Sequence, residues 1–212
     1  MLLIHNAQVV FPSSEAPLLG YVAIEGERII RTGQGPAPAE LTGEATEVVD
    51  ASGATLMPGV IDCHVHFREP GLTHKATMAS ESRAAAAGGV TSWIDMPNTI
   101  PPTTTLDAWE EKNRIAAASA VGNYAFFVGA TSDNLGLLRR LPFDRVPGVK
   151  LFMGQSTGNM AVEGNGAVEA IFAEVEAPIV VHAEDDTVIA ANLQRLRAEF
   201  GEELPVSLHS RL

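Results

Sequence analysis

The pattern of hydrophobic and polar residues changes near residue 57. Short strand-like runs at 1–11, 20–32 and 46–56 are separated by segments rich in Pro, Ser and Gly. From residue 57 onwards, apolar runs of strand length alternate with longer segments of helical character. The pattern therefore predicts two domains, a small antiparallel β-module resembling a sandwich over 1–56 and an α/β domain over 57–212.

The α/β domain repeats a strand followed by a helix. The predicted strands are 60–65, 90–96, 123–128, 148–153 and 178–182, and the predicted helices are 77–87, 106–120, 134–140, 167–176 and 186–200. Such repeats favour a parallel sheet, either open or closed into a barrel. A (β/α)8 barrel uses roughly 31 residues per unit, so the domain has room for about five units. No Gly-rich phosphate turn, typical of an open doubly wound sheet, follows the first strand. We therefore expect a partial (β/α)8 TIM-type barrel.

Composition narrows the class of protein. The chain has 14 Lys and Arg against 26 Asp and Glu, a net charge of -12, which disfavours nucleic acid as a partner. The single cysteine, Cys63, cannot form an intramolecular disulfide and fits a reducing compartment. We find no signal peptide and no apolar run long enough for a membrane span, so we expect a cytoplasmic protein without a membrane partner.

Candidate chemistry begins at the end of the first predicted α/β strand. His64 and His66 are two residues apart, so both imidazoles face one side of the strand, with Arg68 next in the same phase. Two such histidines suit zinc, and a guanidinium suits a carboxylate. The alternative is two hydrogen-bonded histidines without a metal. Alternation points Cys63 away from the histidines, so we expect it in the core, whereas Asp62 either orients a neighbour or is a minor ligand.

Other polar residues also fall at strand ends, where the active sites of (β/α)8 barrels lie. Asn98 follows the second of these strands, Lys150 lies in the fourth, and His182 ends the fifth. A charged lysine in an apolar strand is costly, so Lys150 either is neutral or reaches a carboxylate. A neutral amine can capture carbon dioxide, and the resulting carbamate can bridge two metal ions that promote hydrolysis.

Four segments resemble the N-terminal half of dihydroorotases, which belong to the amidohydrolase superfamily. They lie in the family's order and are the residues 57–75, 95–99, 149–160 and 181–184. The resemblance implies that His64 and His66 bind a first zinc ion and His182 a second, with carboxylated Lys150 bridging them. It also implies that Arg68 and Asn98 hold the substrate carboxylate. The implied reaction is the reversible, zinc-dependent interconversion of L-dihydroorotate and N-carbamoyl-L-aspartate in pyrimidine synthesis.

The resemblance also shows what this stretch of chain does not supply. Dihydroorotases are longer, and their general-base aspartate and a further metal-binding histidine are expected beyond Leu212. We therefore expect no general base within the 212 residues and poor activity from them alone. The alternatives are another cyclic-amide hydrolase, similar to dihydropyrimidinase or allantoinase, and a catalytically silent structural partner. Relatives of the former type usually lack the Arg-plus-Asn pair. Association as a homodimer or with another pyrimidine-pathway enzyme stays open.

Overall fold

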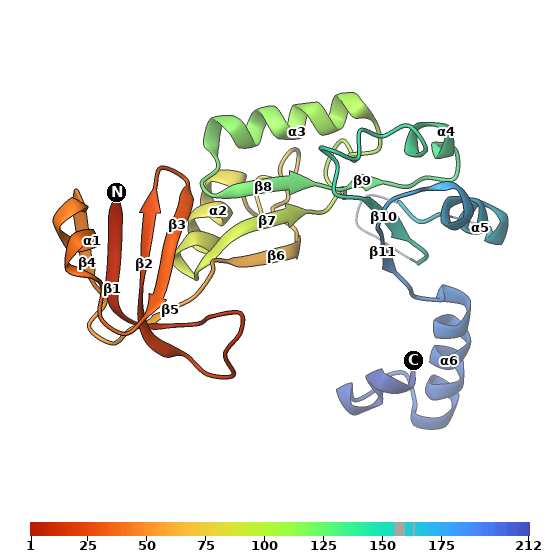
Figure 1. Cartoon of the computed structure of the whole chain (residues 1–212). Helices are drawn as coiled ribbons and strands as arrows, with labels where there is room; N and C mark the ends of the chain where they lie inside the picture. The colour runs from red at the N-terminus through yellow and green to blue at the C-terminus, as the bar shows by residue number, and fades with distance from the viewer. Residues whose placement is uncertain (155–159, 163) are drawn as a thin grey trace. The chain divides into compact units, whose positions relative to one another are not determined.

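The computed structural model describes residues 1–154, 160–162 and 164–212 (Figure 1). These residues form two compact units, Met1–Gly59 and Val60–Leu212. Residues 155–159, which belong to the motif at 149–160, lie outside the described part of the chain.

The first unit contains one five-stranded mixed sheet. Its elements are β1 (Leu2–Val9), β2 (Leu18–Glu25), β3 (Arg28–Gln34), α1 (Ala39–Glu44), β4 (Glu47–Asp50) and β5 (Thr55–Leu56). β1 pairs antiparallel with β2, and β2 with β3, but β4 and β5 both run parallel to β1. The prediction of an antiparallel module is therefore wrong for β4 and β5. The loops after β1 and β2 reverse the chain, whereas the connection through α1 returns it in the direction of β1.

The second unit is built from parallel strands and helices in alternation (Figure 1). The strands are β6 (Val60–Val65), β7 (Val90–Asp95), β8 (Asn123–Phe126), β9 (Val128–Gly129), β10 (Val149–Phe152) and β11 (Ile179–His182). The helices are α2 (Met78–Ala87), α3 (Leu106–Ser119), α4 (Leu135–Leu138), α5 (Asn165–Glu174) and α6 (Asp186–Phe200), followed by a 3-10 helix at Val206–Arg211. The predicted alternation is confirmed.

The parallel strands form two three-stranded groups, ordered β6-β7-β8 and β11-β10-β9. Only Phe127 separates β8 from β9, so one segment pairs first with β7 and then with β10. All neighbouring strands in the two groups run parallel, and the β8–β9 segment links the groups. The carboxyl ends of β6, β7, β10 and β11 therefore point in the same direction. The strands of the described residues do not close into a barrel.

Aromatic packing attaches the helices to this sheet. Phe67, Trp93 and Phe126 lie in the main core cluster, and the indole Nε1 of Trp109 on α3 donates to the Phe126 carbonyl at 3.0 Å. Both α2 and α3 begin at a threonine whose hydroxyl accepts a backbone N–H of the first turn. The caps mark where α2 and α3 begin, and therefore where the loops that follow β6 and β7 end.

Cys63 is exposed, and the prediction that it is a core residue is wrong. In the part of the chain that the structure describes, β6 pairs with β7 alone and is therefore the edge strand of its group. The core cluster includes Val65 and Phe67 but none of the residues 60–64. Alternation assigned Cys63 to a face that no element among the described residues covers, and a periodic pattern cannot show which faces are covered.

Candidate functional site

The two histidines at the end of β6 lie side by side. The ring centroids of His64 and His66 are 5.4 Å apart, with 56° between the ring planes. The carboxylate of Asp62 accepts the backbone N–H of His64 at 3.1 Å. Asp62 therefore contacts the backbone of its neighbour, one of the two roles expected for it, and leaves both imidazoles free of its carboxylate.

Lys150 and His182 lie on the neighbouring strands β10 and β11. Lys150 is 1% exposed, and its Nζ lies 4.8 Å from the ring centroid of Phe152. Burial lowers the pKa of Lys150, which favours the neutral amine. Within the described chain no carboxylate forms an ion pair with this lysine, which argues against the alternative of a lysine that reaches a carboxylate.

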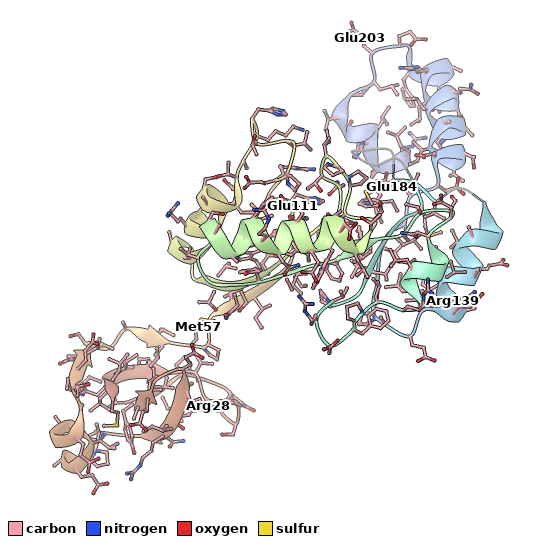
Figure 2. The ribbon with its side chains drawn as sticks, turned by 90° about the horizontal axis from the view of Figure 1, so that it is seen from above. Arg28, Met57, Glu111, Arg139, Glu184 and Glu203 are labelled. Carbon is pink, nitrogen blue, oxygen red and sulfur yellow. The ribbon has the colours of Figure 1, made fainter. Side chains whose placement is uncertain are left out.

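His182 on β11 lies opposite Phe152 on β10 in the parallel pairing, and their ring centroids are 6.0 Å apart. Its Nε2 lies 3.1 Å from a carboxylate oxygen of Glu184, in the loop after β11 (Figure 2). This contact leaves Nδ1 as the imidazole nitrogen of His182 that is free for another ligand.

The electrostatic effects connect these residues across strands. Burial lowers the pKa of His64, the positive charges of Lys150 and His182 lower it further, and Asp62 opposes them. Burial is also the main cause that lowers the pKa of His66, followed by the positive charge of Arg68. Both shifts favour the neutral imidazole, which has a lone pair for a metal ion.

The donor set fits zinc in its chemistry. Neutral imidazoles are common zinc ligands, and the carbamate of a buried lysine would add carboxylate oxygens. Among the described residues, however, no three His, Cys, Asp or Glu side chains are gathered closely enough to form a metal site by themselves. The predicted set of ligands is the three histidines together with Lys150.

Arg68 and Asn98 follow β6 and β7 respectively. The Nδ1 of His66 lies 2.9 Å from Oδ1 of Asn98, and Asn98 is 5% exposed. When Nδ1 carries the proton, Nε2 of His66 is free for a metal and the Asn98 amide N–H groups remain available to a ligand. Arg68 has φ +68°, a left-handed conformation that is costly for a residue with a Cβ.

The guanidinium of Arg68 has an unsatisfied nitrogen. Its Nη1 is buried and has no hydrogen-bond partner among the residues described. Leaving a buried donor unpaired is costly, more so for a charged group. A left-handed backbone and a guanidinium nitrogen without a partner among the described residues thus occur at the same residue.

The loops carrying Arg68 and Asn98 are in direct contact. The backbone N–H of Ile100 donates to the Pro70 carbonyl at 3.1 Å. Gly71 has φ +82°, and a Cβ built on it would lie 2.0 Å from the Ile100 carbonyl oxygen. Only glycine allows this approach, so the spacing of the two loops depends on Gly71.

We expect Gly71→Ala to lower the free energy of unfolding by about 3 kcal/mol, because it combines left-handed strain with a backbone clash. Gly89→Ala is the matched control, since Gly89 has φ +85° and nothing within 4 Å of its Cβ position. The control should cost only about 1 kcal/mol. Urea denaturation of both variants measures the difference, and equal losses would show that the loops separate without cost.

A buried ion pair lies beneath these loops. Lys112 Nζ on α3 is 2.5 Å from Asp95 Oδ2 at the end of β7, and both side chains are 0% exposed. Asp95 Oδ1 also accepts the Phe67 backbone N–H at 2.8 Å, and Lys112 Nζ donates to the Met96 carbonyl at 3.0 Å. Burial lowers the pKa of Lys112, and Asp95 opposes the shift.

Sequence reasoning missed this pair. The available signal was helical spacing, because Lys112 shares the buried face of α3 with Trp109 and Ala116, at positions i, i+3 and i+7. A lysine on an apolar helix face requires a buried partner, and Asp95 precedes the loop that carries Asn98.

The sequence was compared with models of known protein families and with known proteins. Residues 53–201 match the family model described as dihydro-orotase-like. The chain belongs to the dihydro-orotase-like family. Over 169 residues this dihydro-orotase-like chain is 41% identical to the dihydroorotase of Halobacterium salinarum, covering 77% of the chain and 38% of that relative. It is also 37% identical over 166 residues to the L-hydantoinase of Paenarthrobacter aurescens, covering 76% of the chain and 36% of that relative.

A solved structure agrees with this assignment. The L-hydantoinase (dihydropyrimidinase) from Arthrobacter aurescens superposes with a TM-score of 0.84 at 31% identity, covering 95% of the dihydro-orotase-like chain and 45% of that structure. The 212 residues thus span less than half the length of the relatives they match and correspond to an N-terminal portion. No helix in the described ranges is both long and apolar enough to cross a membrane.

Proposed function

We propose that the protein containing this chain is a zinc-dependent dihydroorotase, and that these residues supply its carboxylate-binding groups and most of its metal ligands. The observation that carries the proposal is the buried Nη1 of Arg68, which has no hydrogen-bond partner among the described residues. Arg68 lies in the loop that contacts the loop of Asn98. A guanidinium fork and an amide N–H can together bind a carboxylate. L-Dihydroorotate is a cyclic amide that carries such a carboxylate.

The reaction is the opening of a ring amide. The oxygen of water bonds to the ring carbonyl carbon, the carbon–nitrogen bond breaks, and the nitrogen takes a proton, which gives N-carbamoyl-L-aspartate. The reverse steps close the ring and release water. Arg68 and Asn98 would hold the carboxylate in both directions, so that the reacting amide lies at a constant position near the histidines. The general base is expected beyond Leu212.

Four residues would hold the zinc ions: His64 and His66 at the first, His182 at the second, and Lys150 between them after carboxylation. When bound, zinc supplies Lewis-acid activation of water and of the amide carbonyl. The buried amine of Lys150 favours carboxylation, because its lowered pKa leaves the nitrogen lone pair available to attack carbon dioxide.

The fold supports a further part of the proposal. We infer that the parallel strands β6 to β11 are the first units of a (β/α)8 barrel and that the remaining strands lie in the rest of the protein. The solved L-hydantoinase, of which the chain covers 45%, supports this inference. The exposed edge strand β6 would then pair with the last strand of the barrel.

Replacing Lys150 tests its metal role separately from its role in folding. We expect Lys150→Met to bind at most about half as much zinc as the wild type, because the bridging carboxylate is lost. The free energy of unfolding should be unchanged or higher, since a buried amine is replaced by an apolar side chain of similar length. Zinc is measured by atomic absorption after dialysis, and stability by urea denaturation.

The exposed residue Lys75 provides the control for this substitution. Lys75→Met should keep the zinc content of the wild type. Wild-type zinc content in Lys150→Met would contradict the proposed bridge.

A second candidate is a hydantoinase or dihydropyrimidinase, favoured by the TM-score of 0.84 to the Arthrobacter aurescens protein. The two candidates differ in whether the substrate carries a carboxylate. L-Dihydroorotate and dihydrouracil share one ring and differ only in that group, so their hydrolysis by the complete protein should be compared. A preference for dihydroorotate supports the proposal, and a preference for dihydrouracil supports the second candidate.

A further inference from the structure

The buried Asp95–Lys112 pair contacts the backbone on both sides of the carboxylate site. Asp95 accepts the N–H of Phe67, the residue between His66 and Arg68. Lys112 donates to the carbonyl of Met96, two residues before Asn98. One ion pair therefore holds the backbone one residue before Arg68 and two residues before Asn98, the residues proposed to bind the carboxylate.

Stability alone does not explain this pair. Two charges at 0% exposure have lost their hydration, and apolar residues of similar volume often serve a core equally well. The surroundings are apolar, because Lys112 lies over the Phe126 ring at 4.8 Å and shares the α3 face with Trp109. Apolar residues would fill this volume, but they would offer no acceptor to Phe67 and no donor to Met96.

We propose that Asp95 and Lys112 are positioning residues that set the spacing between Arg68 and Asn98. The inference rests on the proposed carboxylate site. Asp95 fixes the end of β6 relative to β7, and Lys112 fixes the start of the Asn98 loop relative to α3. The packing of Gly71 on Ile100 then joins the two loops at their tips. The pair thus acts on the carboxylate through Arg68 and Asn98 and makes no contact with it.

The test uses two double variants of the complete protein that remove both charges. Asp95→Leu with Lys112→Met removes the backbone contacts and keeps an apolar core. Asp95→Asn with Lys112→Met keeps an amide oxygen for the Phe67 N–H and conserves side-chain volume. The control is Glu111→Gln with Arg114→Met, which removes an exposed acid–base pair from the same helix (Figure 2).

Two readouts separate positioning from folding. The first is the dissociation constant for L-dihydroorotate, measured by calorimetry and compared with the melting temperature of each variant. The second needs no ligand: the 15N resonances of the Arg68 and Asn98 side chains report the two residues that the pair is proposed to position. A merely structural pair would change the melting temperature and leave these resonances in place.

We expect the leucine–methionine variant to bind dihydroorotate about tenfold more weakly, because small displacements of binding groups are costly. Its Arg68 and Asn98 side-chain resonances should shift or broaden. The asparagine–methionine variant should bind dihydroorotate about threefold more weakly and shift the Arg68 and Asn98 resonances less. It decides the question if the other variant does not fold. The control should match the wild type.

Wild-type affinity and unchanged resonances in a folded double variant would overturn the inference. A different result refutes the proposed function instead. If the wild type itself does not bind dihydroorotate, the carboxylate site is wrong, and the ligand-free resonances still decide whether the pair positions the two strand ends.

Discussion

Arg68→Met is expected to weaken the binding of L-dihydroorotate by about a hundredfold. A guanidinium forms charge-assisted hydrogen bonds with a carboxylate, and losing about 3 kcal/mol of such contacts corresponds to that factor. The binding of dihydrouracil, which has no carboxylate, should change little. Calorimetric titration of both ligands, or kcat and KM for both in the complete protein, measures the difference.

The same substitution should not destabilise the fold. The Nη1 of Arg68 has no partner within the part of the chain that the structure describes, so its removal breaks no hydrogen bond at that nitrogen. The melting temperature should therefore stay near that of the wild type. Arg83→Met is the matched control, because Arg83 is exposed on α2 and its guanidinium donates to the carbonyl of Ala79 in the same helix. Equal weakening of both ligands in Arg68→Met would show that Arg68 does not act through a carboxylate.

Lys112→Met is expected to cause the largest loss of stability, about 3–5 kcal/mol. It leaves the Asp95 carboxylate buried at 0% exposure without its cation, which is the costly way to break a buried pair. Urea denaturation, with the midpoint and slope compared with the wild type, measures the loss. Adding Asp95→Asn should restore much of the stability, because no unpaired charge then remains.

An exposed pair on the same helix provides the comparison. Arg114 contacts Glu111 one turn earlier, with side chains that are 72% and 45% exposed, and Arg114→Met should cause little measurable change. A similarly small effect of Lys112→Met would mean that Asp95 becomes protonated or hydrated at little cost. The pair would then contribute little to the fold.

Local sequence patterns were sufficient for the elements of the α/β unit. The runs at 60–65, 90–96 and 178–182 became β6, β7 and β11 because apolar runs of strand length, broken by turn residues, favour strands wherever they occur. The helix predicted at 106–120 became α3, with Thr105 as its cap. The motifs of the dihydroorotase resemblance are likewise local, and the family assignment followed from them.

The site was only partly accessible from the sequence. Spacing placed His64 beside His66, and the apolar context of Lys150 indicated a buried amine, because each depends on neighbours along the chain. The contact between His182 and Glu184 and the left-handed backbone of Arg68 were not predicted. Whether these residues bind zinc and a carboxylate stays a prediction that the experiments above test.

The sequence by itself determined the type and order of the elements in the α/β unit, the family and the candidate site residues. Only the tertiary structure decided that β4 runs parallel to β1, that Cys63 is exposed, and that Lys112 pairs with Asp95. The physical reason is the distance along the chain over which each effect acts. Periodicity and capping act over a few residues, whereas strand direction, burial and ion pairing depend on segments that only folding brings together.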